Sequence, residues 1–577
     1  MKKILTYLKP YRRTAILAPL LMFIEVIMDL LQPTLLSRIV DNGINAGNID
    51  YIIKTGIIMI SVAFIGGLGG FGCIISSTIT SQNFATDLRS DLFKKIQSFS
   101  FSNLDKFKTG SLITRLTNDV TQVQNIVLMS LRIMVRAPLL FIGGIIMAMS
   151  INLKLTLILI ISIPILIISV SLIIKKGFPL FTLVQEKIDR VNTVMRENLA
   201  GIRVVKAFVR EEKEKARFHN ANLELTETMI NASKLISSTM PVMMLIMNLS
   251  IVAVLWFGGL QINAGAMKEG QLIAFINYLT QILFSLLMIA FILMMVSRAK
   301  ISAERIIEVL ETEVDIKDAE TARDIEITRG EVIFENVSFQ YTGAKGDAVL
   351  KNISFKAESG QTVAILGGTG SGKTTLVSLI PRLYDVSSGR ILIDHQDIRN
   401  YKLNALRKGI GVVLQKSVLF SGTIRDNLKW GNKNVSDEKM IAACKAACAH
   451  DFIMSFPEQY DTLLGQGGVN LSGGQKQRLS IARALIKEPK ILILDDSTSA
   501  VDMETESKIQ KALKEMKGTT IFIIAQRISS VMNADKIIVL EDGEIVAEGR
   551  HEELLKTSPI YQDIYHSQIR EGESLND

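Results

Sequence analysis

Six long apolar stretches constrain this chain more than any other feature of its sequence. A helix needs roughly 20 predominantly apolar residues to cross a bilayer, and six segments before residue 300 reach that length. They are Thr14–Leu36, Tyr51–Ile79, Ile126–Ser150, Leu153–Ile174, Leu235–Ile262 and Gln271–Val296. We therefore predict an all-α membrane domain with six spans, in a multi-pass protein of the cell membrane.

The connections between the six segments alternate in length. Those after the second and fourth segments run for tens of residues and are rich in charge, whereas the others are short. The chain opens MKKILTYLKPYRR, and such cationic flanks favour a cytoplasmic N-terminus. The long connections would then be cytoplasmic, and we expect a coupling helix that contacts another domain in each, within Thr109–Gln124 and Arg196–Phe208.

The chain of 577 residues is too long for one compact core, and its C-terminal part has a different pattern. EVIFENVSFQY, VLKNISFKA and QTVAIL alternate or run apolar, as β-strands do. We predict a membrane domain over 1–310, a linker over 311–330, an α/β domain over 331–570 and a tail over 571–577. Lys and Arg flanking the spans account for the net charge of +8, so no nucleic-acid partner is expected.

A phosphate-binding loop follows the apolar strand 362–366. The sequence GGTGSGKTT fits the pattern G-x-x-x-x-G-K-[ST]. In such a loop, glycines turn backbone N–H groups toward phosphates, the Lys binds the β and γ phosphates, and the first hydroxyl binds Mg²⁺. The expected ATP-binding residues are Gly367, Gly368, Thr369, Gly370, Ser371, Gly372, Lys373, Thr374 and Thr375, with Thr374 on the metal.

Two further motifs make the pattern specific. ILILDD (Ile491–Asp496) reads as a buried strand ending in acids, of which Asp495 would help to hold Mg²⁺. LSGGQ (Leu471–Gln475) lies about twenty residues ahead of that strand. With these motifs the whole chain resembles an ABC exporter, in which a six-helix membrane domain is fused to an α/β P-loop ABC ATPase domain.

The resemblance implies further site residues. Tyr341 matches the aromatic that stacks on adenine, and Gln415 matches the glutamine that touches Mg²⁺ and faces the membrane domain. Ser472, Gly473, Gly474 and Gln475 match the signature that binds the γ-phosphate of a nucleotide on the opposite subunit. Ser499, Ala500, Val501 and Asp502 match the loop that crosses between subunits. The family organisation therefore implies a dimer that sandwiches two ATP molecules.

Two positions next to the attacking water depart from the family pattern. The residue after Asp495 is normally a glutamate that acts as general base, but here it is Asp496. A histidine is expected where this chain has Gln526. The aspartate is one methylene shorter, and a misplacement of about 1 Å can cost about a hundredfold in rate. Gln466 and Gly467 also stand where many exporters carry Glu-Arg.

These departures beside an intact LSGGQ resemble the degenerate-site subunit of bacterial heterodimeric multidrug exporters. A homologous partner chain would then supply the glutamate and histidine. The alternatives are a homodimeric exporter with slow ATPase, a lipid or peptide exporter, and a regulator or channel that uses ATP only to change shape. An importer is disfavoured because importers usually carry their ATPase on a separate chain.

Charged residues inside the bilayer are costly and invite functional hypotheses. Glu25 and Asp29 share a face of the first span, and Arg132 and Arg136 are spaced likewise in the third. The two pairs either neutralise each other or leave an acid to attract cationic cargo. The methionines of the last two spans favour mixed hydrophobic cargo. They are Met240, Met243, Met244, Met247 and Met288.

Overall fold

The computed structural model describes residues 2–341, 346–525 and 527–573, and it divides into two compact units. The first unit comprises the chain up to Gln97 together with Gly110–Glu311. The second comprises Ser98–Thr109 and the chain from Thr312 onward. The helical first unit is thus interrupted by a short segment that belongs to the second.

The first unit is entirely helical in its described residues. Its elements are α1 (Lys2–Leu5), η1 (Thr6–Tyr11), α2 (Arg12–Ile39), η2 (Val40–Ile44), α3 (Ile49–Gln97), α5 (Thr109–Thr114), η3 (Arg115–Asp119), α6 (Val120–Leu131), α7 (Ile133–Ile151), α8 (Leu153–Ala200), α9 (Ile202–Ala207), α10 (Glu211–Ser237), α11 (Thr239–Asn263) and α12 (Glu269–Glu311). Among the described residues, six helical stretches are long and apolar enough to cross a membrane. Each contains one predicted span, so the prediction of six spans is confirmed.

The helices are much longer than a bilayer requires. The longest, α3, has 49 residues, which at the usual rise makes it roughly 70 Å long, against a hydrocarbon core of about 30 Å. Its C-terminal part carries charged residues, including Lys94 and Lys95 in the last turn. The spanning helices therefore continue well beyond the membrane, as the charged connections indicated.

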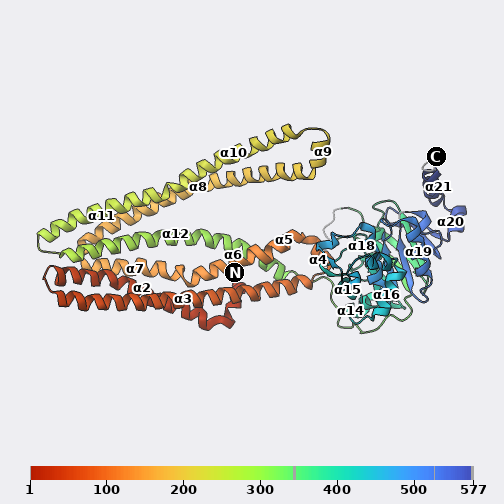
Figure 1. Ribbon diagram of the computed structural model, residues 1–577, viewed down its shortest axis with the longest axis horizontal. Helices are drawn as coiled ribbons and strands as arrows, with labels where there is room; N and C mark the ends of the chain where they lie inside the picture. The colour runs from red at the N-terminus through yellow and green to blue at the C-terminus, as the bar shows by residue number, and fades with distance from the viewer. Residues whose placement is uncertain (1, 342–345, 526, 574–577) are drawn as a thin grey trace. The chain divides into compact units, whose positions relative to one another are not determined.

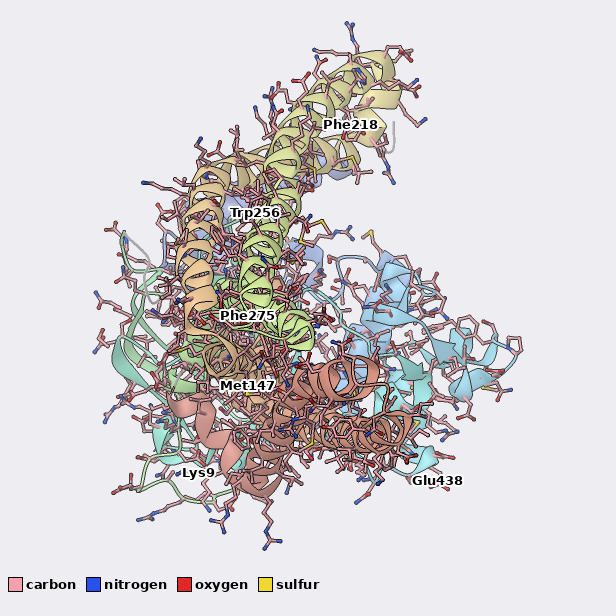
Figure 2. The ribbon with its side chains drawn as sticks, turned by 90° about the vertical axis from the view of Figure 1, so that its left-hand side faces the viewer. Lys9, Met147, Phe218, Trp256, Phe275 and Glu438 are labelled. Atoms are coloured by element: carbon pink, nitrogen blue, oxygen red, sulfur yellow. The ribbon has the colours of Figure 1, made fainter. Side chains whose placement is uncertain are left out.

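The helices of the first unit form a bundle and a hairpin. Helices α2, α3, α7 and α12 pack alongside one another, whereas α8 packs against α10 in a hairpin closed by α9 (Figure 1). Figure 2 shows this hairpin diverging from the bundle, with Phe218 near its far end. Phe275 of α12 is completely buried in the bundle, while Trp256 of α11 is 70% exposed. The apolar surface of α11 therefore remains open in the single chain.

The third span contains a break that the sequence did not predict. Arg132, with φ −117° and ψ −83°, separates α6 from α7. One turn later, Arg136 forms an ion pair with Glu25 and a second one with Asp29, at 2.8 Å in the latter case. One arginine therefore satisfies both acids of the first span, which supports the structural reading of these charges.

The described residues of the second unit form three β-sheets. Its strands are β1 (Val332–Phe339), β2 (Leu350–Ala357), β3 (Thr362–Gly367), β4 (Ser388–Ile393), β5 (Gln396–Asp397), β6 (Ile410–Val413), β7 (Gly422–Thr423), β8 (Leu463–Leu464), β9 (Ile491–Asp495), β10 (Thr520–Ile524), β11 (Lys536–Glu541) and β12 (Glu544–Gly549). The largest sheet has the order β12-β11-β3-β10-β9-β6, and the others are β2-β1-β4-β5 and β7-β8. All pairs of the largest sheet except β11 with β12 are parallel.

Helices surround these sheets. They are α4 (Phe101–Lys106), α13 (Lys373–Leu379), η4 (Ile398–Asn400), α14 (Leu403–Lys408), α15 (Ile424–Lys429), α16 (Asp437–Ala446), α17 (His450–Met454), η5 (Gln459–Asp461), η6 (Gln466–Gly468), α18 (Gly473–Ile486), α19 (Met503–Lys514), η7 (Ile528–Ser530), α20 (His551–Thr557) and α21 (Pro559–Glu573). Alternate residues of β9 enter two different cores, Ile493 with the β1 strand and Leu494 with α16 and α18. Burial of both faces explains the continuous apolar run that predicted this strand.

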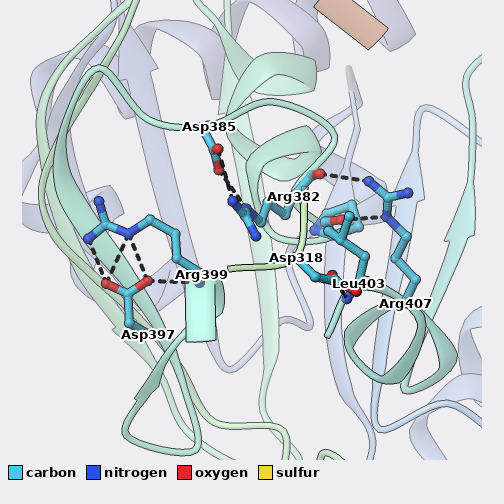
Figure 3. Close-up of polar contacts among 8 residues, drawn as sticks. Asp318, Arg382, Asp385, Asp397, Arg399, Leu403 and Arg407 are labelled. Atoms are coloured by element: carbon cyan, nitrogen blue, oxygen red, sulfur yellow. Dashed lines mark hydrogen bonds and ion pairs between the residues drawn. The ribbon is translucent and has the colours of Figure 1, made fainter. Parts of the chain in front are cut away.

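The segment predicted as a linker is packed onto the second unit rather than extended. Asp318 accepts a hydrogen bond of 2.8 Å from the backbone N–H of Leu403, at the start of α14 (Figure 3). From the same helix, Arg407 donates to the carbonyl oxygens of Pro381 and Arg382 at 3.1 and 2.8 Å. These bonds connect the chain entering the unit with the turn that follows α13.

Candidate functional site

Four loops meet at the carboxyl edge of the six-stranded sheet. The neighbouring strands β3, β10, β9 and β6 are parallel, so the residues that follow them lie at one edge, where ligands of open α/β sheets bind. Gly368 follows β3, Asp496 follows β9 and Gln415 lies two residues beyond β6. Gln526 lies two residues beyond β10 but falls outside the described residues.

The glycines of the loop after β3 are required by its backbone. Gly367, Gly370 and Gly372 have φ of +152°, +89° and +97°, values that L side chains rarely adopt. A Cβ at Gly372 would also lie 2.8 Å from the Leu350 side chain. The predicted phosphate-binding loop therefore has a conformation that only this glycine pattern allows.

Inside this loop, two groups are placed to meet an anion. The Lys373 ammonium donates to the carbonyl oxygens of Gly367 and Gly368 at 2.9 and 2.6 Å, and burial lowers its pKa. The buried Ser371 hydroxyl has no hydrogen-bond partner among the described residues. Buried polar groups are almost always hydrogen-bonded, so the loop fits a phosphate that would accept from both groups.

A second contact joins the loop helix to the acidic strand. Thr374 Oγ1 donates to Asp495 Oδ1 at 3.1 Å, and Asp495 is only 3% exposed. Burial raises the pKa of Asp495, and the neighbouring Asp496 contributes in the same direction. A hydroxyl and a carboxylate oxygen in contact are the hard donors that Mg²⁺ prefers, so this pair fits the predicted metal site.

Tyr341 lies beside the loop helix within an aromatic cluster. Its hydroxyl is 2.9 Å from Thr375 Oγ1, and its ring packs edge-on against Phe339 and Tyr384 at centroid distances of 4.9 and 5.3 Å. These contacts hold the ring next to the phosphate-binding loop. The position is compatible with stacking on a base whose phosphates occupy that loop.

Asp496 is anchored by its backbone. It has φ +45°, its N–H donates to Ile524 O at 3.0 Å, and its carbonyl accepts from Ser499 Oγ at 3.0 Å. Its carboxylate Oδ2 accepts from Gln415 Nε2 at 3.3 Å. The structure thus brings both predicted residues together and ties the backbone of Asp496 to the end of β10 and to its own loop.

The signature residues form the capped start of a helix. Ser472 Oγ accepts from Gln475 N–H, and Gln475 Oε1 accepts from Ser472 N–H at 2.9 Å, a complete capping box for α18. A Cβ at Gly474 would lie 2.8 Å from Ala500 O, and Gln477 Oε1 accepts from Ala500 N–H at 3.0 Å. The glycine thus allows the signature helix to pack closely against the loop that follows β9.

Asp502 ends that loop and begins the next helix. Its carboxylate accepts from the N–H and the hydroxyl of Thr505 at 2.9 and 2.8 Å, and these hydrogen bonds lower its pKa. The residue is therefore the N-cap of α19. None of the hydrogen bonds among the described residues joins Ser472–Gln475 to the phosphate-binding loop, as expected if the signature serves another subunit.

Sequence analysis assigned no helix from the N-terminal half of the chain to the second unit. Helix α4 belongs to that unit. The coupling helices expected within Thr109–Gln124 and Arg196–Phe208 stay predictions. Tyr384 donates to Asp105 at 2.7 Å and packs on Phe101 at a centroid distance of 6.1 Å. Burial, together with this hydrogen bond to Asp105, raises the pKa of Tyr384.

The same segment is anchored a second time. Asn103 Nδ2 donates to Glu313 O at 3.1 Å, while Asn103 also completes a capping box with Ser100. The Ser-x-x-Asn spacing was the available sequence signal, but it reports a helix start rather than a contact. Tyr384, which lies between Tyr341 and α4, had no distinguishing sequence signal.

Comparisons with known proteins agree on one family. The family model described as ABC transporter transmembrane region matches residues 15–287, and the one described as ABC transporter matches residues 350–499. YfiB of Bacillus subtilis, an uncharacterized ABC transporter ATP-binding protein, is 47% identical over 99% of both chains. The ATP-dependent lipid A-core flippase of Syntrophus aciditrophicus is 35% identical over 88% of this chain and 84% of its own.

A solved structure extends the likeness to the whole fold. A bacterial Atm1-family ABC exporter with ATP bound matches with a TM-score of 0.79 at 26% identity, over 96% of this chain and 98% of that chain. The matched length includes both the membrane helices and the ATPase unit. The chain therefore belongs to the ABC transporter family and is a multi-pass half-transporter, in which a six-helix membrane domain is fused to an ATP-binding domain whose hydrolysis of ATP drives transport.

Proposed function

We propose that this chain is the degenerate-site subunit of a heterodimeric exporter. The exporter carries hydrophobic or amphipathic small molecules, drugs among them, out across the cell membrane. The N-terminus and the ATPase domain lie in the cytoplasm, and the second subunit is a homologous half-transporter. The observation that carries the proposal is the anchored, shortened Asp496 beside a signature helix whose cap is complete.

The phosphate-binding side of the site is intact. Lys373 and the N–H groups of Gly368–Gly372 bind the phosphates of ATP, and Tyr341 stacks on its adenine. Thr374, Asp495 and Gln415 would hold Mg²⁺ with hydroxyl, carboxylate and amide oxygens. When bound, the ion neutralises charge on the phosphates. This half of the site needs no residue that the chain lacks.

The water-activating side is deficient. The backbone of Asp496 is hydrogen-bonded to Ile524 and to Ser499 of its own loop, and these bonds oppose an advance of the backbone that would compensate for the missing methylene. Its carboxylate falls short of the attacking water by roughly 1 Å, which lowers the rate by about a hundredfold. Gln526 has no imidazole to contact the γ-phosphate. We infer that the site binds ATP and hydrolyses it slowly.

The signature side has no such defect. The capping box between Ser472 and Gln475 keeps the first N–H groups of α18 ordered, and Gly473 and Gly474 leave the backbone accessible to a γ-phosphate. The Asp502 cap orders the adjacent loop. The chain thus contributes a complete signature to the partner's site, where the partner's glutamate and histidine perform hydrolysis.

The membrane helices favour neutral or mixed cargo over a specific cation site. Glu25 and Asp29 are both paired with Arg136, so we infer that they hold α2 against α7. Met240 and Met244 are about half exposed on α11, and methionine surfaces adapt to varied ligands. Replacing Glu25 and Asp29 with Gln and Asn should reduce export of cationic and neutral dyes equally. Selective loss of the cationic dyes would overturn the structural assignment.

A lipid cargo is the second candidate. It is favoured by the 35% identical lipid A-core flippase, which covers most of this chain. The two candidates differ in the assay: a drug exporter accumulates dye in inside-out vesicles, whereas a flippase changes the leaflet exposure of a labelled lipid. Both assays are run on the same proteoliposomes.

The heterodimer is tested by comparing this chain alone with a reconstituted pair. The second chain is a co-expressed homologous half-transporter that has Glu and His at the positions of Asp496 and Gln526. We expect stable co-purification, slow ATPase from the lone chain and ATP-dependent dye accumulation only with the pair. The matched control is the pair with the partner's P-loop Lys replaced by Ala. Brisk ATPase from the lone chain, equal to that of the pair, would contradict the proposal.

A further inference from the structure

A buried carboxylate outside the nucleotide motifs joins two loops of the site. Glu506, on the first turns of α19, is only 6% exposed. Its Oε1 accepts from Thr498 Oγ1 at 2.8 Å and from Ser530 Oγ at 2.5 Å. Thr498 belongs to the loop after β9, and Ser530 ends η7, the turn after β10. One carboxylate oxygen therefore contacts both loops.

The two loops leave neighbouring strands at the same edge of the sheet. The strands β9 and β10 are paired in parallel, and Asp496 N–H extends that pairing by bonding Ile524 O. Beyond this point the loops separate, one toward the signature helix and one toward η7. Glu506 reconnects them two residues past Asp496, on the side away from the strands.

The turn η7 is hydrogen-bonded to two helices, α19 and α21. Gln510, one turn after Glu506, donates to Ser530 O at 2.9 Å. On its other end, Ile528 N–H donates to Gln568 Oε1 of α21 at 2.8 Å. The described residues following Gln526 are thus fixed to α19 and α21, so that a displacement of this turn is transmitted to α19.

Burial makes this link effective. A buried charge is costly unless it is hydrogen-bonded. Moving either hydroxyl away from Glu506 therefore leaves the buried carboxylate without one of its hydrogen bonds. The free energy is lowest when the other loop moves in the same direction and both hydrogen bonds to Glu506 are kept. Because hydrogen bonds to an ionised group are stronger than neutral ones, the carboxylate is a stiffer connection than an amide or a hydroxyl would be.

We propose that Glu506 is a positioning residue that couples the turn after β10 to the loop after β9. The path continues from Thr498 to Ala500, which contacts the signature helix through Gln477 and Gly474. A displacement of η7 is therefore communicated to the signature of the same chain. The coupling concerns the ATPase domain of this chain and holds for a homodimer as well as for a heterodimer.

The test uses the full-length chain, reconstituted in proteoliposomes with whichever chain completes its dimer. Glu506→Leu removes both acceptors and keeps the side-chain volume. We expect kcat for ATP to fall by at least about tenfold while KM changes by less than about threefold, because the residues that bind ATP are untouched. Glu506→Gln keeps an oxygen that can accept from both hydroxyls but carries no charge, so we expect a smaller loss of kcat than in Glu506→Leu. The control is Glu504→Leu, an exposed acid on the same helix.

A second pair of variants leaves Glu506 in place, in case the leucine variant fails to fold. Thr498→Val and Ser530→Ala each break one bond of the link. If the two bonds act as one connection, the double variant should lose no more kcat than the more severe single variant. Additive losses, an unchanged kcat in the single variants, or a parallel change in kcat and KM would overturn the proposal.

Discussion

The two sides of the nucleotide site differ in how closely their residues match the sequence pattern of the family. The phosphate-binding side consists of Gly367–Thr375 with Asp495, and every residue agrees with the pattern and lies in a geometry that suits phosphate and metal. The water-activating side consists of Asp496 and Gln526 with Gln415, and two of these three depart from the pattern. In our proposal, binding and hydrolysis therefore depend on different residues, and this chain retains the residues for the first.

If the proposal holds, the chain preserves one function of the site while losing another. Phosphate binding depends on backbone turns and one ammonium, which are set by local sequence. Water activation depends on placing one carboxylate to within about 1 Å, so a single methylene is enough to lose it. A subunit that binds ATP without rapid hydrolysis can still hold a dimer closed, because binding energy rather than turnover stabilises the assembled state.

The largest effect is expected from removing the ammonium of the phosphate-binding side. Lys373→Ala should weaken binding of ATP to this chain by about 100-fold, because it deletes charge-assisted hydrogen bonds to the phosphates. Equilibrium titration with a fluorescent ATP analogue measures the change. Lys433→Ala, at an exposed lysine in a loop, is the control. Unchanged ATP affinity in Lys373→Ala would show that ATP binding does not depend on the phosphate-binding side of the site.

Restoring the water-activating side should have the next largest effect. Asp496→Glu combined with Gln526→His should raise ATP turnover at this chain's site by roughly 10- to 100-fold, because it returns the carboxylate and the imidazole to the water and the γ-phosphate. Single-turnover hydrolysis of labelled ATP measures the rate. The same two substitutions, added to the Lys373→Ala variant, should give no increase in ATP turnover. If the double variant hydrolyses no faster than the wild type, the defect lies elsewhere.

Loss of the adenine-stacking ring should weaken binding without changing turnover. Tyr341→Ala should reduce ATP affinity about tenfold, the usual cost of one lost aromatic–base stack. Tyr341→Phe, which loses only the contact with Thr375, should stay within about twofold. The measurement compares kcat/KM for ATP with kcat/KM for a triphosphate that lacks the base. This comparison separates the contribution of stacking from that of phosphate binding. Equal affinities in the Ala and Phe variants would contradict the assigned role.

The smallest effect is expected at Tyr384, which lies between the Tyr341 ring and α4. Tyr384→Phe removes the hydrogen bond to Asp105 and should lower cargo-stimulated ATPase about two- to threefold, with ATP affinity unchanged, since one exposed bond contributes about 1 kcal/mol. Asp105→Asn, alone and combined with Tyr384→Phe, completes a double-mutant cycle. Independent effects of the two substitutions would show that α4 does not act through this bond.

The sequence predicted the features that depend on residues adjacent to one another in the chain. Each apolar stretch became a membrane-length helix because a span requires its own run of apolar residues. The P-loop was predicted because strand, glycines, lysine and helix are contiguous. The pairing of Glu25 and Asp29 with an arginine of the third span was one of two readings that the sequence left open, because it depends on how separate helices meet. The break at Arg132 has no signature in any one segment.

Contacts between distant residues account for the remaining misses. Glu506 joins residues 498 and 530, and no motif of the chain contains all three. Tyr384 reaches a helix whose residues lie 279 positions earlier in the sequence. The contact of α4 with Tyr384 had no distinguishing sequence signal, because charge and helical pattern continue through the whole connection. Only the three-dimensional structure distinguishes the residues that make these contacts from their neighbours.

The nucleotide that remains on this chain after turnover tests the division of the site most directly. A reconstituted transporter, whose partner has its P-loop lysine replaced, is incubated with radiolabelled ATP and Mg²⁺, and the retained nucleotide is separated by chromatography. Only this chain's phosphate-binding loop is then competent to bind. The account predicts that the retained nucleotide is ATP, with ADP appearing in the Asp496→Glu, Gln526→His variant. If the wild-type chain instead retained ADP that formed as fast as it does in the variant, the division of the site would be contradicted.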